Sequence, residues 1–299
     1  MNFLCPHPPV SRTLVLQNAR LCVEVAPPRA HGLASRWARG GFITQVTLDG
    51  QHQFCTQESP DPSIGNGGQG LCHEFGIFRP VGFEETPIGG RFPKIGVGLL
   101  FRPDEKPYSF QRPYDVLPFD TEVEHTDASL TFHTLPRPCN GWAFDLSERL
   151  ELHGNTLSIV CKLRNVGQKR IQTHEYRHNF LSFGGARPNP DWRLQLAPGL
   201  KFKDQTPLVP HDGQWGWPQA PLAPMGYGIA GSPLASGPLW TLRDVISGLS
   251  VSETLLGPLE HLFLWVTPDV VSPEVFVDLD VAPGGCARWT RIYHFCGPS

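Results

Sequence analysis

Glycine and proline are spread so densely through this chain that long helices have little room to form. The sequence holds 31 residues of each type among 299 positions. Proline lacks the backbone N–H that helix hydrogen bonds need, and glycine loses more conformational entropy in a helix than other residues do. We therefore expect strands and turns to dominate. Apolar residues make up 40% of the chain and charged residues 18%, which is enough apolar surface for a core and too little charge for disorder.

Alternation of apolar and polar residues supports this expectation. It predicts half-buried strands in segments 14–16, 42–48, 130–133, 157–163 and 262–266. The pairs Asp49-Gly50 and Gly154-Asn155 are typical of hairpin turns. No internal repeat with a fixed period occurs, which argues against a propeller or a solenoid. These features predict an all-β fold, a large antiparallel two-sheet β-sandwich, built as a single domain over residues 1–299.

The segment 207–238 shows neither the helical nor the strand period, yet it carries Trp215, Trp217 and Tyr227. A flexible linker is one interpretation. Linkers seldom carry so much aromatic surface, so we expect a long ordered loop that lies over the sheet.

Charge and cysteine content exclude several classes of function. The formal net charge is −3 and no five like charges follow one another, so we expect no nucleic-acid and no membrane partner. The first residues lack a basic segment followed by an apolar one, which predicts a cytoplasmic protein. The eight cysteines are scattered singly and no CxxC occurs, so we expect reduced thiols and no metal site, despite the adjacent Cys72 and His73.

Three segments, taken in order, carry a resemblance to a known family. They are 163–167 (LRNVG) with 173–183 (THEYRHNFLSF), then 192–202 (WRLQLAPGLKF) with 206–208 (TPL), and last 272–274 (SPE) with 279–289 (LDVAPGGCARW) and 293–295 (YHF). In this order they resemble the galactose mutarotase (aldose 1-epimerase) superfamily. The resemblance implies a two-sheet supersandwich that binds a small-molecule sugar in a cleft on one sheet, with no cofactor, as a monomer or homodimer. The chain departs from the family by lacking its usual asparagine in the histidine strand and an upstream Asn-Arg-Ile segment.

The resemblance assigns His178 as general acid and Glu274 as general base. Mutarotation needs one group to take the proton of the anomeric hydroxyl and another to protonate the ring oxygen, so the two groups are expected to flank the sugar. The alternative roles are a hydrogen-bonded core histidine and a solvated strand-end carboxylate. His174 competes with His178, because alternation puts both on one strand face. Arg177 points to the opposite face and is predicted to be structural.

Two further groups of residues are candidates for substrate binding. Glycine-rich segments 67–76 and 89–98 carry His73, Glu74 and Lys94, which either sit on tight turns as surface charges or surround the same sugar. A phosphate cradle would need a Gly-x-x-x-x-Gly-Lys-Ser/Thr pattern and a following helix, and the pattern is missing. Near the other end of the chain, Trp217 can stack on a sugar face and Asp212 can accept hydroxyl hydrogen bonds, unless both simply pack in their loop.

These observations support a carbohydrate-active isomerase resembling aldose 1-epimerase, which interconverts sugar anomers by His/Glu acid–base catalysis. One alternative is a non-catalytic carbohydrate-binding protein, since the same sheet can hold a sugar without completing the acid–base pair. Another is a lyase or isomerase of a modified sugar on the same fold.

Overall fold

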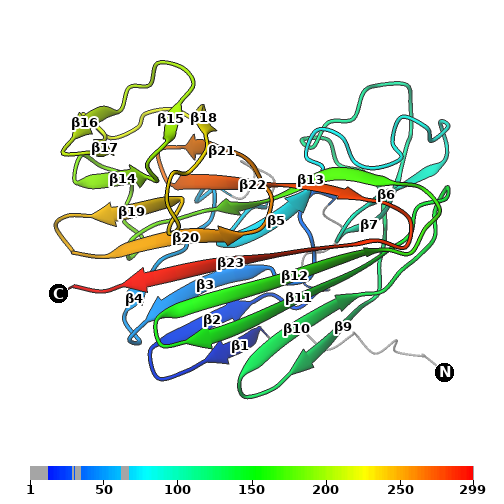
Figure 1. Cartoon of the computed structure of the whole chain (residues 1–299), viewed down its shortest axis with the longest axis horizontal. Coiled ribbons are helices and arrows are strands. Elements are labelled where there is room, and N and C mark those ends of the chain that lie inside the picture. Colours follow the sequence, from blue (N-terminus) through cyan, green and yellow to red (C-terminus); the bar gives the residue numbers. More distant parts are fainter. Residues whose placement is uncertain (1–12, 29, 31–34, 62–66, 299) are drawn as a thin grey trace, which may run out of the picture.

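Strands and turns make up the described part of the chain, as its glycine and proline content predicts. The computed structural model describes residues 13–28, 30, 35–61 and 67–298, and within them no helix occurs. The strands of this part form two ten-stranded sheets and one three-stranded sheet, and paired strands run antiparallel (Figure 1). The all-β, two-sheet prediction is thereby confirmed.

The first large sheet carries the two strands that matter most for the site, β13 and β22, side by side near its middle. Its strand order is β1 (Leu14–Gln17), β2 (Leu21–Val25), β3 (Ile43–Leu48), β5 (Leu71–Phe75), β13 (Ile171–Asn179), β22 (Val271–Val281), β21 (Leu259–Val266), β18 (Met225–Gly231) and β15 (Leu200–Phe202), with β4 (His52–Gln53) pairing with β3.

The second large sheet packs against the first and brings the last strand of the chain, β23, to its centre. Its order is β16 (Val209–His211), β17 (Gln214–Gly216), β14 (Trp192–Leu196), β19 (Trp240–Asp244), β20 (Ser250–Leu256), β23 (Cys286–Cys296), β12 (Thr156–Asn165), β11 (Phe144–His153), β10 (Ser129–Thr134) and β9 (Thr121–His125). The small sheet is formed by β6 (Arg91–Lys94), β7 (Gly98–Phe101) and β8 (Val116–Pro118).

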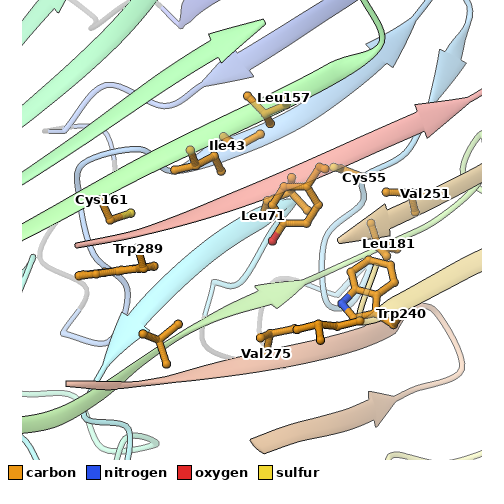
Figure 2. Packing of buried hydrophobic residues seen from close by; sticks show 14 of the residues in the cluster. Ile43, Cys55, Leu71, Leu157, Cys161, Leu181, Trp240, Val251, Val275 and Trp289 are labelled. Atoms are coloured by element: carbon orange, nitrogen blue, oxygen red, sulfur yellow. The ribbon is translucent and has the colours of Figure 1, made fainter. Parts of the chain in front are cut away.

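Alternation along the strands places one row of side chains from each large sheet in a common core. Figure 2 shows Leu71 and Val275 of the first sheet with Leu157, Cys161 and Trp289 of the second in this layer. Each of these side chains is no more than 2% exposed. Burying a valine or leucine side chain contributes about 1.5–3 kcal/mol, so this layer contributes strongly to stability.

The predicted strands and turns are present at their expected places. The five alternating segments correspond to β1, β3, β10, β12 and β21. Asp49 and Gly50 connect β3 to β4 with φ angles of 52° and 70°, and Gly154 connects β11 to β12 with a φ of 57°. Backbone of this kind suits hairpin turns, which explains why the short turn signals predicted them correctly.

The segment 207–238 is more regular than predicted, and the expectation of a long loop is wrong for part of it. It contains the hairpin β16–β17 and the strand β18, which pairs with β15 and β21. Two of these strands are only three residues long and β18 is interrupted by glycine, so no period is visible in the sequence. Trp215 packs against Phe202, with ring centroids 5.2 Å apart.

Two findings bear on the expected environment of the protein. Within the described ranges, no helix has the length and apolar character needed to cross a membrane. The seven cysteines of the described part are free thiols, and Cys5 lies outside the described residues.

Candidate active site

A cavity of about 520 Å³ opens on the face of the first sheet that points away from the second sheet. Neighbouring strands β13, β22 and β21 form its floor, and loops complete its walls. Its volume lies in the range of roughly 300–1,000 Å³ that is usual for small-molecule sites. Seven of the lining side chains are aromatic or apolar and six are polar or charged: Ile77, Phe78, Phe110, Tyr176, Phe263, Trp265 and Phe276, with Arg36, Glu58, Gln111, His178, His261 and Glu274.

His178 of β13 and Glu274 of β22 meet at the floor of this cavity. Nε2 of His178 lies 3.0 Å from Oε1 of Glu274, and each residue is 5% exposed. The strand register explains the meeting. Tyr176 pairs with Phe276, so two positions further along an antiparallel pair His178 lies across from Glu274 and on the same face.

Ser272 completes a compact hydrogen-bonded group with this pair. Its Oγ lies 2.8 Å from Nδ1 of His178 and 3.3 Å from Oε1 of Glu274. The backbone N–H of Asn179 donates to the same Oγ at 2.8 Å. Both ring nitrogens of His178 therefore have a defined partner.

Electrostatics favour an uncharged pair. Burial raises the pKa of Glu274 well above its ordinary value, against the opposing effects of the Arg36 charge and the Ser272 hydrogen bond. Burial, assisted by Arg36, lowers the pKa of His178 well below its ordinary value. Both directions have the same cause, since desolvation disfavours whichever form is charged. Both shifts favour the neutral forms, with the proton on Glu274 and an uncharged imidazole.

A buried ion cluster supports the cavity wall from behind. The carboxylate of Glu74 accepts Nε of Arg36 at 2.9 Å, Nζ of Lys94 at 2.7 Å and the hydroxyl of Tyr176 at 3.0 Å. Burial raises the pKa of Glu74, but the two cations outweigh it and the pKa of Glu74 is lowered overall. Arg36 and Tyr176 line the cavity, whereas Glu74 and Lys94 are fully buried beneath them. The cluster fixes the arginine at the cavity wall.

Comparison with known proteins finds similarity in structure but not in sequence. No family model and no curated protein matches this sequence. Solved structures do match over nearly the whole chain. The protein Slr1438 from Synechocystis sp. PCC 6803 is 18% identical with a TM-score of 0.64, and 99% of this chain aligns with 100% of that one.

Two further matching structures identify the fold. A galactose mutarotase-like protein from Lactobacillus casei ATCC 334 is 12% identical with a TM-score of 0.58, covering 95% of this chain and 100% of the other. Galactose 1-epimerase from Lactobacillus acidophilus NCFM is 13% identical with a TM-score of 0.55, covering 96% and 95%. At such low identities the likeness establishes the galactose mutarotase-like fold alone, and chemistry has to be argued from the site.

On this fold, the structure brings together the two residues predicted to be catalytic but separates His73 from them. His73 points between the two sheets, where its Nε2 lies 2.8 Å from Oε2 of Glu148 and 3.1 Å from the carbonyl of Gly40. The reason is alternation: His73 pairs with Arg177, whose side chain faces the second sheet, while its neighbour Glu74 faces the cavity side. Arg177 donates to Glu148 in that interior, in accordance with its predicted structural role.

The remaining predicted binding residues do not line the cavity. His174 shares the strand face of His178, but it lies beside Phe276 with Nδ1 3.8 Å from Glu260. Asp212 is exposed at the tip of the β16–β17 hairpin, and Trp217 is 3% exposed in the core. Both belong to the edge of the second sheet, because the fold places this hairpin next to β14 rather than over the first sheet.

Sequence reasoning missed Arg36 and Ser272. Arg36 lies at the cavity wall between the rings of Trp37 and Phe110, with its Cζ 4.0 Å and 4.4 Å from their centroids. The adjacent Arg36-Trp37 pair was a weak signal of cation–π packing, and nothing in the sequence pointed to Ser272 beyond its position two residues before Glu274. No group of three or more potential metal ligands is gathered in the part of the chain that the structure describes.

Proposed function

We propose that the protein interconverts the anomers of a sugar at the His178–Glu274 pair. The observation that carries this proposal is the direct contact of an imidazole and a carboxyl group, 3.0 Å apart, at the floor of a cavity of small-molecule size. Ring opening needs one proton acceptor and one proton donor, and an uncharged imidazole beside a protonated carboxyl group supplies one of each.

The proton positions suggest the direction of the first step. Nε2 of His178 takes the proton of the anomeric hydroxyl as the bond between the anomeric carbon and the ring oxygen breaks. Glu274 gives its proton to the ring oxygen, which leaves an open-chain aldehyde. Rotation about the adjacent C–C bond and the reverse transfers close the ring as the other anomer. These roles are the reverse of those expected from the family resemblance, because burial leaves the carboxyl group as the resting proton carrier.

The sugar must replace the hydrogen bond that the two side chains make with each other. The anomeric oxygen and the ring oxygen of a pyranose are bonded to the same carbon, so they present a donor and an acceptor side by side. The ligand can therefore satisfy Nε2 and the carboxyl O–H together without leaving either unpaired. Aromatic lining residues such as Phe110, Phe263 and Trp265 offer faces on which the apolar side of a sugar ring can stack.

The test is anomer exchange measured by NMR magnetisation transfer on a panel of neutral aldoses and sugar phosphates. We expect wild-type protein to accelerate exchange of at least one of them above the buffer rate. The variants His178→Asn and Glu274→Gln should each lose about 10²–10⁴-fold, the usual worth of a general acid or base. His174→Asn is the matched control, because it alters the same strand face outside the cavity lining and should retain exchange. The proposal fails if no aldose responds to wild-type protein.

Sugar binding without turnover is a second candidate, favoured by one observation. His178 and Glu274 already form a hydrogen bond with each other, so neither side chain is left without a partner when no sugar is bound. In that case calorimetry would detect binding of an aldose whose anomer exchange stays at the buffer rate, and Glu274→Gln would retain the affinity.

A further inference from the structure

Ser272 makes a hydrogen-bonding contact with each member of the pair. It is fully buried on β22, two positions before Glu274 and on the same strand face. Its Oγ lies 2.8 Å from Nδ1 of His178 and 3.3 Å from Oε1 of Glu274, and it accepts the backbone N–H of Asn179 at 2.8 Å. The hydroxyl thus has three neighbours and, with one proton and two lone pairs, three places for them.

Proton counting and the contact distances together select one arrangement of this group. Asn179 N–H occupies one lone pair of Oγ. If the hydroxyl donates to Glu274, the second lone pair of Oγ accepts a hydrogen bond from Nδ1–H of His178. The carboxyl proton of Glu274 then lies between Oε1 and Nε2, and the pair is neutral overall. If the hydroxyl donated to Nδ1 instead, the hydrogen bonds would run the other way: Nε2–H would donate to Oε1, and the carboxyl proton would go to Oγ of Ser272 across the longer contact of 3.3 Å. An imidazole nitrogen at 3.0 Å is a better acceptor for a carboxyl proton than a hydroxyl at 3.3 Å, so the first arrangement is preferred.

The position of Ser272 is set by a break in the strand ladder. Regular pairing of β13 with β22 ends at Tyr176 and Phe276, and Pro273 has no N–H to continue it. Beyond this point, hydrogen bonds from side chains connect the two strands. The amide of Asn179 donates to the carbonyl of Pro273 at 2.6 Å, and its Oδ1 accepts the hydroxyl of Tyr293 from the second sheet at 3.0 Å. Asn179 is therefore anchored across the sandwich, and its N–H holds the Ser272 hydroxyl.

We infer that Ser272 is a positioning residue that keeps a proton on Nδ1 of His178, so that Nε2 is the atom that exchanges protons with the substrate and with Glu274. The catalytic consequence rests on the proposed function. The tautomer itself does not, because it follows from the contacts of the free protein.

The first test needs no variant. Long-range ¹H–¹⁵N correlation spectra of the wild-type protein report which ring nitrogens carry protons, and the His178 signals are identified by their loss in His178→Gln. We expect a proton-bearing Nδ1 in the pH range where the protein is folded. A bare Nδ1 beside a protonated Nε2 would overturn the inference.

The second test compares Ser272→Ala with Ser182→Ala. Ser182 is also buried and also makes one side-chain hydrogen bond, to the carbonyl of Ala186 at 3.0 Å, but no hydrogen bond joins it to His178. Ser272→Ala should change the ¹⁵N shifts of His178 toward a mixture of tautomers, and Ser182→Ala should leave them in place. Unchanged shifts in Ser272→Ala would contradict the positioning role.

Kinetics then separate the two proposals. In a protein that exchanges anomers, Ser272→Ala should lower kcat about tenfold, as expected for losing one hydrogen bond that orients the base, with KM nearly unchanged. An equal kcat for Ser272→Ala and Ser182→Ala would overturn the catalytic part of the inference. If wild-type protein shows the expected tautomer but exchanges no aldose, the proposed function fails while control of the tautomer by Ser272 stands.

Discussion

Glu74 shows how a single residue can support a cavity that it does not line. Its carboxylate holds the buried cations of Arg36 and Lys94, and it also accepts the hydroxyl of Tyr176. Removing one partner of a buried ion pair leaves the other charge without compensation, which costs far more than the pair itself gains. Glu74 therefore acts on the site through the position of Arg36.

The substitution Glu74→Gln should lower the free energy of unfolding by about 3–5 kcal/mol, because two buried cations lose their counter-charge. Urea denaturation followed by tryptophan fluorescence measures it. Glu85→Gln is the control, since Glu85 pairs with Lys169 at 2.6 Å with side chains 60% and 41% exposed. Removing that surface pair should cost no more than about 1 kcal/mol. Equal losses in the two variants would contradict the role given to Glu74.

At the scale of elements, strands β13 and β5 carry charges on both faces. The face toward the second sheet holds a buried network in which Arg177 and Arg291 pair with carboxylates of both sheets. His73 lies between two of these carboxylates, with Nε2 2.8 Å from Glu148 and Nδ1 3.7 Å from Glu175. An imidazolium at this place would face one carboxylate with each ring nitrogen. The two sheets are thus joined by ions as well as by apolar packing.

His73 makes stability depend on pH. Burial lowers its pKa, but Glu148 and Glu175 outweigh burial and Arg177, so the pKa of His73 in the folded protein is raised. The folded state then binds the proton more tightly than the unfolded chain does. The stabilisation is complete below the unfolded pKa of about 6.5 and is lost as the pH rises through the raised folded pKa.

We therefore expect His73→Gln to destabilise the protein more at pH 6 than at pH 9. At pH 6 the loss should be about 1.5–3 kcal/mol, the worth of a hydrogen bond to a charged group. Urea denaturation at both pH values measures the difference, with the exposed His125→Gln as the control for general effects of losing a histidine. A gap between wild type and His73→Gln that widened toward pH 9 would reverse the sign and refute the argument.

At the scale of the whole molecule, both large sheets combine strands from distant parts of the chain. The first sheet places β22 next to β13, and the second places β23 between β20 and β12 (Figure 1). Neither the ion network nor the candidate site can form until these late strands are in place. Such non-local pairing slows folding, because the chain must lose the entropy of closing long loops before the stabilising contacts can form.

Removal of residues 286–299 should therefore abolish cooperative folding, because β20 and β12 lose the strand that connects them and the core loses Trp289. Removal of residues 297–299 alone should leave it intact, since β23 ends at Cys296. Thermal unfolding followed by near-UV circular dichroism compares the two truncations. A sharp transition in the longer truncation would show that the second sheet is stable without its central strand.

Local patterns predicted the strands well and one segment poorly. Segments such as 157–163 alternate strictly and lie where β12 does, because a half-buried strand imposes that period on its own residues. Three strands in the segment 207–238 were not predicted. Strands as short as β16 and β17 are too short to show a period in sequence, and they form because they pair with neighbouring strands. The same limit applied to Asp212 and Trp217, whose place depends on which sheet their hairpin joins.

The amino-acid sequence by itself determined that the chain is all-β and where its regular strands lie, and its resemblance to a known family named His178 and Glu274 as the candidates for acid–base chemistry. Only the tertiary structure decided that these two touch, that Ser272 contacts both, that Arg36 lines the same cavity, and that His73 faces the interior. The physical reason is that alternation tells which residues share a strand face, but register and the choice of buried face come from packing between distant strands. A shift of one residue between β13 and β22 would have put His178 and Glu274 out of reach of each other.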